Sequence, residues 1–272
     1  MFAGSNDFRL TKSGDAVEPL ASTERRQLIL RILNSEGKVF VTSLARHLGT
    51  SVVTIRKDLD ALAAQSLLQR SHGGATRCSS ILLDLTLQEK NLQHDEEKSR
   101  IAAKAASLVQ GGDTVFLDSG STTSRLIPHL AGLGSITLIT NALNIAVRAT
   151  EMPNLQLILV GGQFHPKSLA FIGPLAEGML SQLTVEKCFL GVDALDLEKG
   201  ITTPVLEERG IHRTMLDCSQ EVIVLADSSK FGKRSLGVIA GLNRIHRIIT
   251  DSGTSKRYVN ALKRRGVKVL VV

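Results

Sequence analysis

The chain has 272 residues, of which 33 are Lys or Arg and 26 are Asp or Glu, giving a net charge of +7. Hydrophobic residues make up 43% of it and charged residues 22%, a composition typical of globular proteins that bury a core. No apolar run approaches the ~20 residues that span a bilayer, and the first twenty residues lack an apolar signal-peptide core. We therefore expect a cytoplasmic protein that does not enter the membrane.

Residues 1–21 show no periodicity and are expected to form a disordered tail. From residue 22 the pattern predicts a helix ending near Gly37, a short strand, a second helix, a tight turn, a third helix and a second strand. The predicted bounds after the first helix are Lys38–Phe40, Thr42–Leu48, Val52 to about Gln65, and Leu67–Ser71. This order predicts a winged helix-turn-helix domain over residues 22–77.

The positive charge is concentrated in this small domain. Residues 20–77 hold nine basic and four acidic residues, a net charge of +5, whereas residues 78–272 carry +3. In the third helix Val52, Ile55 and Leu59 form an apolar stripe, while Lys57 lies on the opposite face. An ordinary surface helix is the alternative interpretation, but the cap, turn, charge and wing together favour a DNA recognition helix. The residues expected to contact duplex DNA are Ser51, Val53, Thr54, Arg56, Lys57, Arg70 and His72.

Residues 78–93 are interpreted as a linker, with an edge strand around 81–87, and the α/β domain is predicted over residues 94–272. It begins with a helix at 94–110. Continuous apolar runs then alternate with helical stretches, which favours a mainly parallel sheet covered on both faces. The runs are Thr114–Leu117, Ile136–Ile139, Leu155–Val160, Lys187–Leu190, Glu221–Leu225, Ile245–Thr250 and Lys268–Val271.

Ligands of parallel α/β sheets bind beyond the carboxyl ends of the strands, so the polar residues there are candidates for a binding site. The loop at 118–123, DSGSTT, precedes a helix predicted at 124–130. Such a loop presents backbone N–H groups and hydroxyls to a phosphate or carboxylate, although a plain capped turn has the same composition. The candidate effector residues are Asp118, Ser119, Gly120, Ser121, Thr122, Thr123, Thr140, Asn141, Gly161, Gly162, Asp193, Thr202, Thr203, Glu208 and Lys230.

No metal or cofactor is expected. Cys78, Cys188 and Cys218 are far apart, and no Cys or His cluster has metal-ligand spacing. The nucleotide-binding patterns G-x-x-x-x-G-K-[ST] and G-x-G-x-x-G are also missing from the sequence. Five histidines, His94, His129, His165, His212 and His246, are scattered and are expected at the surface or at helix ends.

The segment TERRQLILRILNSEGKVFVTSLARHLGTSVVTIRKDLDALAAQSLLQRSHGGA resembles the DNA-binding signature of the DeoR family of bacterial transcriptional regulators. DSGSTT, TN, GG, FLGVDALDLEKGITTP and DSSKF resemble that family's sensor domain. The resemblance implies a repressor that leaves DNA when a phosphorylated sugar binds a sensor similar to ribose-phosphate isomerases, CoA transferases and sugar-phosphate deaminases. GVDALDLEKG and VLADSSKF are most similar to repressors of N-acetylgalactosamine and galactosamine catabolism.

Three positions depart from the family pattern. Lys57 stands where a second Arg is usual, which keeps the charge but loses a bidentate guanidinium. Ser66 replaces a Gly that often precedes the wing, and Val205 replaces a common Asn in the sensor loop. The change at Val205 removes a polar contact, so it bears on the identity of the effector rather than on the presence of a site.

The sequence therefore favours a DNA-binding repressor of a carbohydrate operon, controlled by a phosphorylated sugar or amino sugar. A homodimer or homotetramer is expected, because one winged helix usually contacts a half-site. The alternative is a sugar-phosphate isomerase-like enzyme in which Asp193 and Glu208 move protons. A purely structural or interaction module leaves the basic helix and the polar strand ends unexplained.

Overall fold

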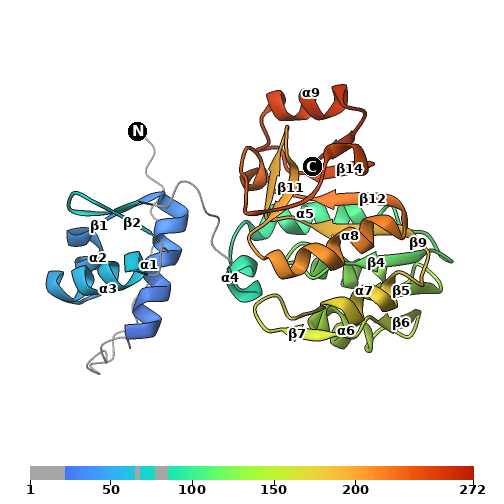
Figure 1. Cartoon of the computed structure of the whole chain (residues 1–272), viewed down its shortest axis with the longest axis horizontal. Helices are drawn as coiled ribbons and strands as arrows, with labels where there is room; N and C mark the ends of the chain where they lie inside the picture. The colour runs from blue at the N-terminus through green and yellow to red at the C-terminus, as the bar shows by residue number, and fades with distance from the viewer. Residues whose placement is uncertain (1–21, 65–67, 77–84) are drawn as a thin grey trace. The chain divides into compact units, whose positions relative to one another are not determined.

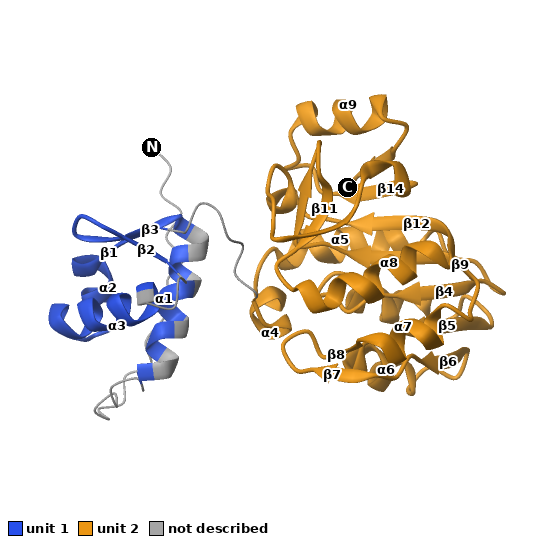
Figure 2. Ribbon diagram, viewed as in Figure 1, with its two compact units in different colours: residues 1–78 blue, residues 79–272 orange. Residues whose placement is uncertain are grey.

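The computed structural model describes residues 22–64, 68–76 and 85–272, and the chain divides into two compact units, Met1–Cys78 and Ser79–Val272 (Figure 2). The expected disordered tail at 1–21 lies outside the described residues, as do Ser66, Cys78 and most of the edge strand expected at 81–87.

Unit 1 has the predicted winged helix-turn-helix plan. Its elements are α1 (Ser22–Glu36), β1 (Lys38–Phe40), α2 (Val41–His47), α3 (Val52–Ala64), β2 (Gln69–Ser71) and β3 (Gly74–Thr76). The three strands form an antiparallel sheet in the order β1-β3-β2. Strand β3 was not predicted, because His72-Gly73-Gly74 was interpreted as a stop. Gly74 instead begins β3. This strand approaches β1 so closely that a Cβ at Gly74 would lie 1.9 Å from the carbonyl oxygen of Val39, which explains why this position is a glycine.

The helices of unit 1 meet in one small core. Ile29 and Leu33 of α1 are completely buried, and so are Ile55 and Leu59 of α3. Ser51 caps α3, because its Oγ accepts a hydrogen bond from the N–H of Thr54 at 3.0 Å. The core thus fixes one face of α3 and leaves the opposite face exposed.

Unit 2 is built on a mainly parallel sheet, as predicted (Figure 1). In its described part, seven strands follow the order β15-β14-β12-β9-β4-β5-β6, and all neighbouring pairs are parallel. They are β4 (Thr114–Leu117), β5 (Ile136–Thr140), β6 (Leu155–Leu159), β9 (Val185–Gly191), β12 (Ser219–Leu225), β14 (Arg247–Thr250) and β15 (Lys268–Val271). Each corresponds to one of the predicted apolar runs.

Helices cover both faces of this sheet. One buried cluster joins it to α5 (Asp95–Ala106), the 3₁₀ helix η1 (Thr123–Leu130) and α6 (Leu143–Ala149). The other joins it to α7 (Pro174–Leu180), α8 (Arg209–Asp217) and α9 (Lys256–Arg264). The helix predicted after the DSGSTT loop is present as the 3₁₀ helix η1, which contains Pro128.

Several smaller elements were not predicted because they are too short for a clear periodicity. They are α4 (Leu87–Asn91), the hairpin of β7 (Gln163–His165) and β8 (Ala170–Ile172), the antiparallel sheet of β10 (Ala194–Asp196), β11 (Gly200–Thr203) and β13 (Gly237–Ala240), and the 3₁₀ helices η2 (Leu206–Glu208), η3 (Ser228–Lys230) and η4 (Leu242–Arg244). No helix in the described ranges has the length and apolar character needed to cross a bilayer.

Strand register brings the candidate site together. Leu117 of β4 pairs with Phe189 of β9, and Leu190 of β9 pairs with Val224 of β12. The polar segments that follow these three central strands therefore meet at one edge of the sheet.

Candidate functional site

The recognition helix of unit 1 presents a small polar and basic surface. Arg56 and Lys57 are exposed on α3, and Val53 keeps 60% of its surface accessible. Thr54 is half-buried, and the exposed Ser51 precedes the helix as its cap. All five lie outside the core cluster of unit 1.

The wing residues differ in how they are engaged. Arg70 Nε lies 3.0 Å from Asp60 Oδ1 on α3, and Arg70 Nη1 donates a hydrogen bond to the carbonyl of Gly74 at 3.0 Å. Its guanidinium therefore ties the wing to the recognition helix. His72 is exposed in the turn between β2 and β3.

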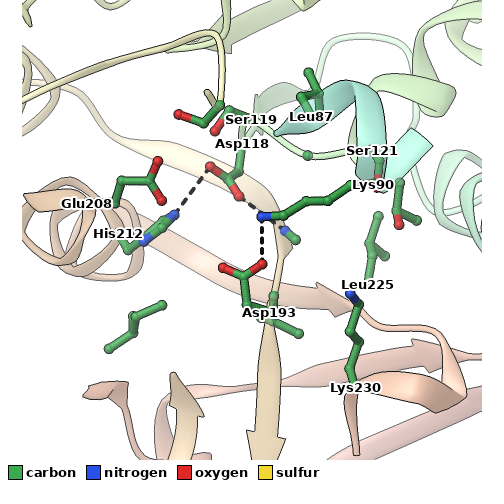
Figure 3. Close-up of a pocket in the computed structure, with 16 residues that line it drawn as sticks. Leu87, Lys90, Asp118, Ser119, Ser121, Asp193, Glu208, His212, Leu225 and Lys230 are labelled. Atoms are coloured by element: carbon green, nitrogen blue, oxygen red, sulfur yellow. Dashed lines mark hydrogen bonds and ion pairs between the residues drawn. The ribbon is translucent and has the colours of Figure 1, made fainter. Parts of the chain in front are cut away.

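A pocket opens at the carboxyl edge of the sheet in unit 2 (Figure 3). It is lined by residues from the ends of β4 and β9, by α4, α8 and η3, and by the segment at Ser168. The predicted effector residues that line it are Asp118, Ser119, Gly120, Ser121, Thr122, Asp193, Glu208 and Lys230.

The loop after β4 supplies hydrogen-bond donors to this pocket. Within the described structure, the backbone N–H groups of residues 119–123 donate to no protein acceptor. Thr123 Oγ1 holds the loop in shape by donating to the carbonyls of Asp118 at 2.6 Å and Gly120 at 3.0 Å. The Arg125 guanidinium also donates to the carbonyl of Ser121. A run of unpaired N–H groups in a shaped loop is suited to binding anionic oxygens.

Carboxylates and a histidine form the opposite, acidic part of the pocket. His212 Nε2 lies 3.5 Å from Asp118 Oδ1, and both side chains are almost completely buried. Burial alone would lower the pKa of His212, but the carboxylate of Asp118, together with Glu208 and Asp193, raises it. Asp118 Oδ1 and Glu208 Oε1 are buried and make no hydrogen bond within the described residues; their contacts are the longer ones to His212 Nε2 and, at 3.4 Å, to His165 Nδ1. His212 Nδ1 is buried and makes no hydrogen bond in the same part of the chain. These atoms can therefore bind hydroxyl or amino groups of a ligand.

Lys90 and Lys230 line the pocket, and the buried Lys98 contacts Lys90 from α5. Lys90 Nζ lies 2.6 Å from Asp193 Oδ1. Burial alone would raise the pKa of Asp193, but the Lys90 ammonium, assisted by Lys230, lowers it. Lys98, on α5, is only 2% exposed, and its ammonium donates to the carbonyl of Lys90. Burial lowers the pKa of Lys98 to about 8, and the nearby Lys230 charge adds to this effect.

Seven predicted effector residues do not line the pocket: Thr123, Thr140, Asn141, Gly161, Gly162, Thr202 and Thr203. Thr203 contacts a residue of the pocket lining, because its Oγ1 lies 3.4 Å from Asp193 Oδ2. Thr140 instead holds neighbouring backbone by donating to the carbonyl of Leu117 at 2.7 Å.

Asn141, Thr202 and Gly162 also have structural contacts, whereas a Cβ on Gly161 would meet no atom within 4 Å. Asn141 Nδ2 donates to the carbonyl of Phe171 at 3.1 Å, and Thr202 Oγ1 accepts from the N–H of Ser235 at 2.9 Å. A Cβ on Gly162 would lie 2.7 Å from the carbonyl oxygen of Ile172, so close packing explains this glycine.

Sequence reasoning missed Leu87, Lys90 and Ser168, which line the pocket, and Lys98 directly behind it. The first two lie in what was interpreted as a linker, where no periodicity marks a functional residue. The expectation that His212 is a surface or helix-end residue is wrong, because α8 carries it into the pocket at 7% exposure. The amphipathic pattern of α8 was the available signal.

The two units match two family models. A model of the DeoR C terminal sensor domain matches residues 93–252, and a model of the DeoR-like helix-turn-helix domain matches residues 25–81. The chain belongs to the DeoR family. This confirms the resemblance that the T-I-R-K-D-L and DSGSTT motifs carry, and the protein is a DNA-binding transcriptional regulator with a C-terminal sensor domain.

Curated DeoR-like relatives align with nearly the whole chain. A protein of Escherichia coli O157:H7 whose name describes an aga operon transcriptional repressor is 35% identical over 253 residues, covering 92% of this chain and 94% of its own. HTH-type transcriptional regulator GlpR of Haloferax volcanii is 34% identical and covers 92% and 98%. Ribose 5-phosphate isomerase from Plasmodium falciparum is 17% identical over 51% of this chain and 54% of its own, with a TM-score of 0.37. That structural likeness supports no conclusion about activity.

Proposed function

We propose that this DeoR-family regulator represses a carbohydrate catabolic operon and leaves its operator when a phosphorylated sugar or amino sugar occupies the pocket of unit 2. The observation that carries the proposal is the pairing of two chemistries in one pocket. The unpaired N–H groups of residues 119–123 suit a phosphate, and the buried polar atoms of Asp118, Glu208 and His212 suit the hydroxyl or amino groups of a sugar.

The phosphate would bind at the loop after β4, with the Lys230 ammonium as a second source of positive charge. Lys230 lines the same pocket, and its charge is close enough to Asp193 and Asp227 to lower the pKa of each against the effect of burial. Backbone donors and a lysine together are the usual means of binding a phosphate group.

The sugar would bind toward the carboxylates. Carboxylate oxygens accept hydrogen bonds from hydroxyl groups and also attract an ammonium, so this side is compatible with a neutral sugar and with an amino sugar. The name of the Escherichia coli relative, which refers to the aga operon, agrees with the similarity of GVDALDLEKG to galactosamine-type repressors and directs the first ligand trials to hexosamine phosphates.

On the DNA side, α3 would enter the major groove. Ser51, Val53, Thr54 and Lys57 would face base edges, while Arg56 and His72 would bind phosphates. Arg70 would act mainly by holding the wing, because its guanidinium already contacts Asp60 and Gly74. A homodimer or homotetramer would place several such helices on repeated or palindromic half-sites.

The test is a melting-temperature screen of the full chain against hexosamine phosphates, pentose phosphates, the corresponding free sugars and inorganic phosphate. A ligand that raises the melting temperature is then added to a gel shift with a DNA duplex that the protein selects from a random pool. We expect a phosphorylated ligand to stabilise the protein and to weaken its DNA complex. Stabilisation by the free sugars alone would contradict the phosphate assignment, and no effect on the DNA complex would contradict control by this pocket.

The isomerase-like alternative finds less support in the same geometry. Asp193 is paired with Lys90 and has a lowered pKa, which makes its carboxylate a weak proton acceptor. Incubation of the protein with hexosamine and pentose phosphates separates the two functions. Product formed well beyond one equivalent of protein would support catalysis and contradict a purely sensory pocket.

A further inference from the structure

Helix α4 contributes Leu87 and Lys90 to the lining of the pocket. It is a single five-residue helix, and it is the first described element after residues 77–84. Thr86 and Glu89 form a capping box at its start, in which the Glu89 N–H donates to Thr86 Oγ1 and the Thr86 N–H donates to Glu89 Oε2. A helix this short is not stable by itself in water, so its position depends on tertiary contacts.

Those contacts come from the pocket wall and from α5 and η1. Lys90 Nζ lies 2.6 Å from Asp193 Oδ1, and the Lys90 carbonyl accepts a hydrogen bond from the buried Lys98 ammonium. Asn91 is held by the Arg125 guanidinium, which reaches its side-chain oxygen at 3.3 Å and its carbonyl at 3.2 Å. The same guanidinium binds the carbonyl of Ser121 in the loop with the unpaired N–H groups.

Charged groups of both signs surround α4, with Lys90 paired to Asp193 and Arg125 paired to Asp95. Burial is the main reason that the pKa of Lys98 falls to about 8, and the charges of Lys230, Arg125 and Lys90 lower it further, whereas Asp227 opposes them. A phosphate bound at the loop would add about two negative charges to the pocket that α4 lines. It would favour the charged form of Lys98 and compete with Asp193 for the Lys90 ammonium.

We propose that α4 transmits effector binding to the DNA-binding unit, and that the effector acts by drawing Lys90 away from Asp193. The inference rests on the proposed function, since it needs an anionic effector in this pocket. Lys90 belongs to the only turn of α4, so a change in its partner shifts the start of the chain segment that joins the two units. In this proposal α4 has one position with Lys90 bound to Asp193 and another with Lys90 drawn away from it. The bound effector makes the second position more stable, and this shift in population alters the DNA affinity.

The test uses the full chain, galactosamine 6-phosphate and ribose 5-phosphate as probes, and a duplex selected from a random pool. Hydrogen exchange of the amides at 86–92 is measured with and without saturating probe, and DNA affinity is measured under the same conditions. For the wild type we expect a changed exchange rate in this segment and a change in DNA affinity of about 5- to 150-fold, the usual range of coupling between sites.

The decisive variant is Lys90→Met, which keeps the aliphatic stem but has no ammonium. At saturating probe we expect less than a twofold change in its DNA affinity and no probe-dependent change in α4 exchange. Lys90→Arg, which keeps the positive charge, should retain most of the wild-type response, and Lys104→Met, an exposed position on α5, should retain all of it. Rescue by arginine also excludes a general folding defect at this position.

The outcomes separate the two proposals. If the wild type binds a probe but exchange at 86–92 is unchanged, or if Lys90→Met keeps the full DNA response, the role of α4 is wrong and the effector site stands. If neither probe shifts the melting temperature of the wild type, the proposed function with these sugar phosphates fails, and the role of α4 fails with it.

Discussion

Arg25 Nε lies 2.6 Å from Asp58 Oδ2, so α1 holds the recognition helix through an ion pair whose carboxylate is only 2% exposed. Arg26 Nε binds the other oxygen of Asp58 at 2.9 Å. Asp58 is the aspartate of the T-I-R-K-D-L motif. Its two arginine partners give that position a structural role, which separates it from its neighbours Arg56 and Lys57 on the exposed face of the helix.

Replacement of Asp58 by alanine is therefore expected to destabilise unit 1. Removing one partner of a buried pair leaves the other charge uncompensated, and we expect a loss of about 2–4 kcal/mol in the free energy of unfolding. Hydrogen exchange of α1 and α3 in urea measures this. Asp60→Ala is the matched control, since Asp60 is 65% exposed in its pair with Arg70 and should contribute less than about 1 kcal/mol. Equal effects at both positions would contradict this role of Asp58.

Arg56→Ala and Lys57→Ala should each weaken binding to a selected duplex by at least about tenfold without lowering the melting temperature. Both side chains are exposed and lie outside the core of unit 1. Loss of a phosphate contact at Arg56 should also reduce the slope of log affinity against log salt by about one. Gel shifts at several salt concentrations measure this, with Arg100→Ala on α5 as the control. Affinity within a few-fold of the wild type would refute the assignment.

Ser121→Asp should make repression insensitive to the effector while DNA binding persists. Ser121 lies in the loop with unpaired N–H groups and is 7% exposed, so an aspartate there puts a negative charge where the phosphate is proposed to bind. Reporter assays with and without inducer measure the response. Ser121→Ala, which adds no charge, serves as the control, and normal induction in Ser121→Asp would count against the loop.

Lys98→Met should stabilise the protein and weaken phosphosugar binding together. Burial lowers the pKa of Lys98 to about 8, so keeping this ammonium charged costs free energy in the folded state. Removing it should stabilise unit 2 by about 1–2 kcal/mol at neutral pH, although the Lys90 carbonyl then loses its hydrogen bond from Lys98. Between pH 8 and the ordinary lysine value the unfolded chain binds more protons, so wild-type stability should rise with pH there. The variant should lack this rise. Calorimetry from pH 7 to 10 measures both effects, and a destabilised variant would contradict the prediction.

His212→Gln should remove a pH-dependent part of the stability of unit 2. Because the folded-state pKa of His212 is raised, its interaction with Asp118 is fully present below the ordinary histidine pKa and is lost as pH rises through the folded value. The melting-temperature difference between wild type and variant should thus be largest near pH 6 and shrink at higher pH. His129→Gln, at an exposed position, is the control. A difference independent of pH would argue that His212 stays neutral.

Much of the fold could be predicted because its signals are local. The apolar runs at 114–117 and 219–225 correspond to central strands, and the stripe of Ile55, Leu59 and Leu62 is the buried face of α3. Hydrophobic periodicity depends only on neighbouring residues, so helices and strands of sufficient length can be predicted from the sequence alone. Elements of three to five residues, such as β7, β10 and α4, have too few residues to show a period.

The sequence by itself determined that a basic helix-turn-helix precedes a parallel α/β domain and that polar residues follow its strands. The tertiary structure decided which of these residues meet. Asp118, Asp193 and Glu208 converge on one pocket, whereas Thr140 and Asn141 donate hydrogen bonds to backbone carbonyls. It also added Lys90, Lys98 and His212, which lie on helices that none of the motifs includes. The physical reason is that strand register and helix packing set distances between segments, and these are long-range contacts that no local pattern encodes.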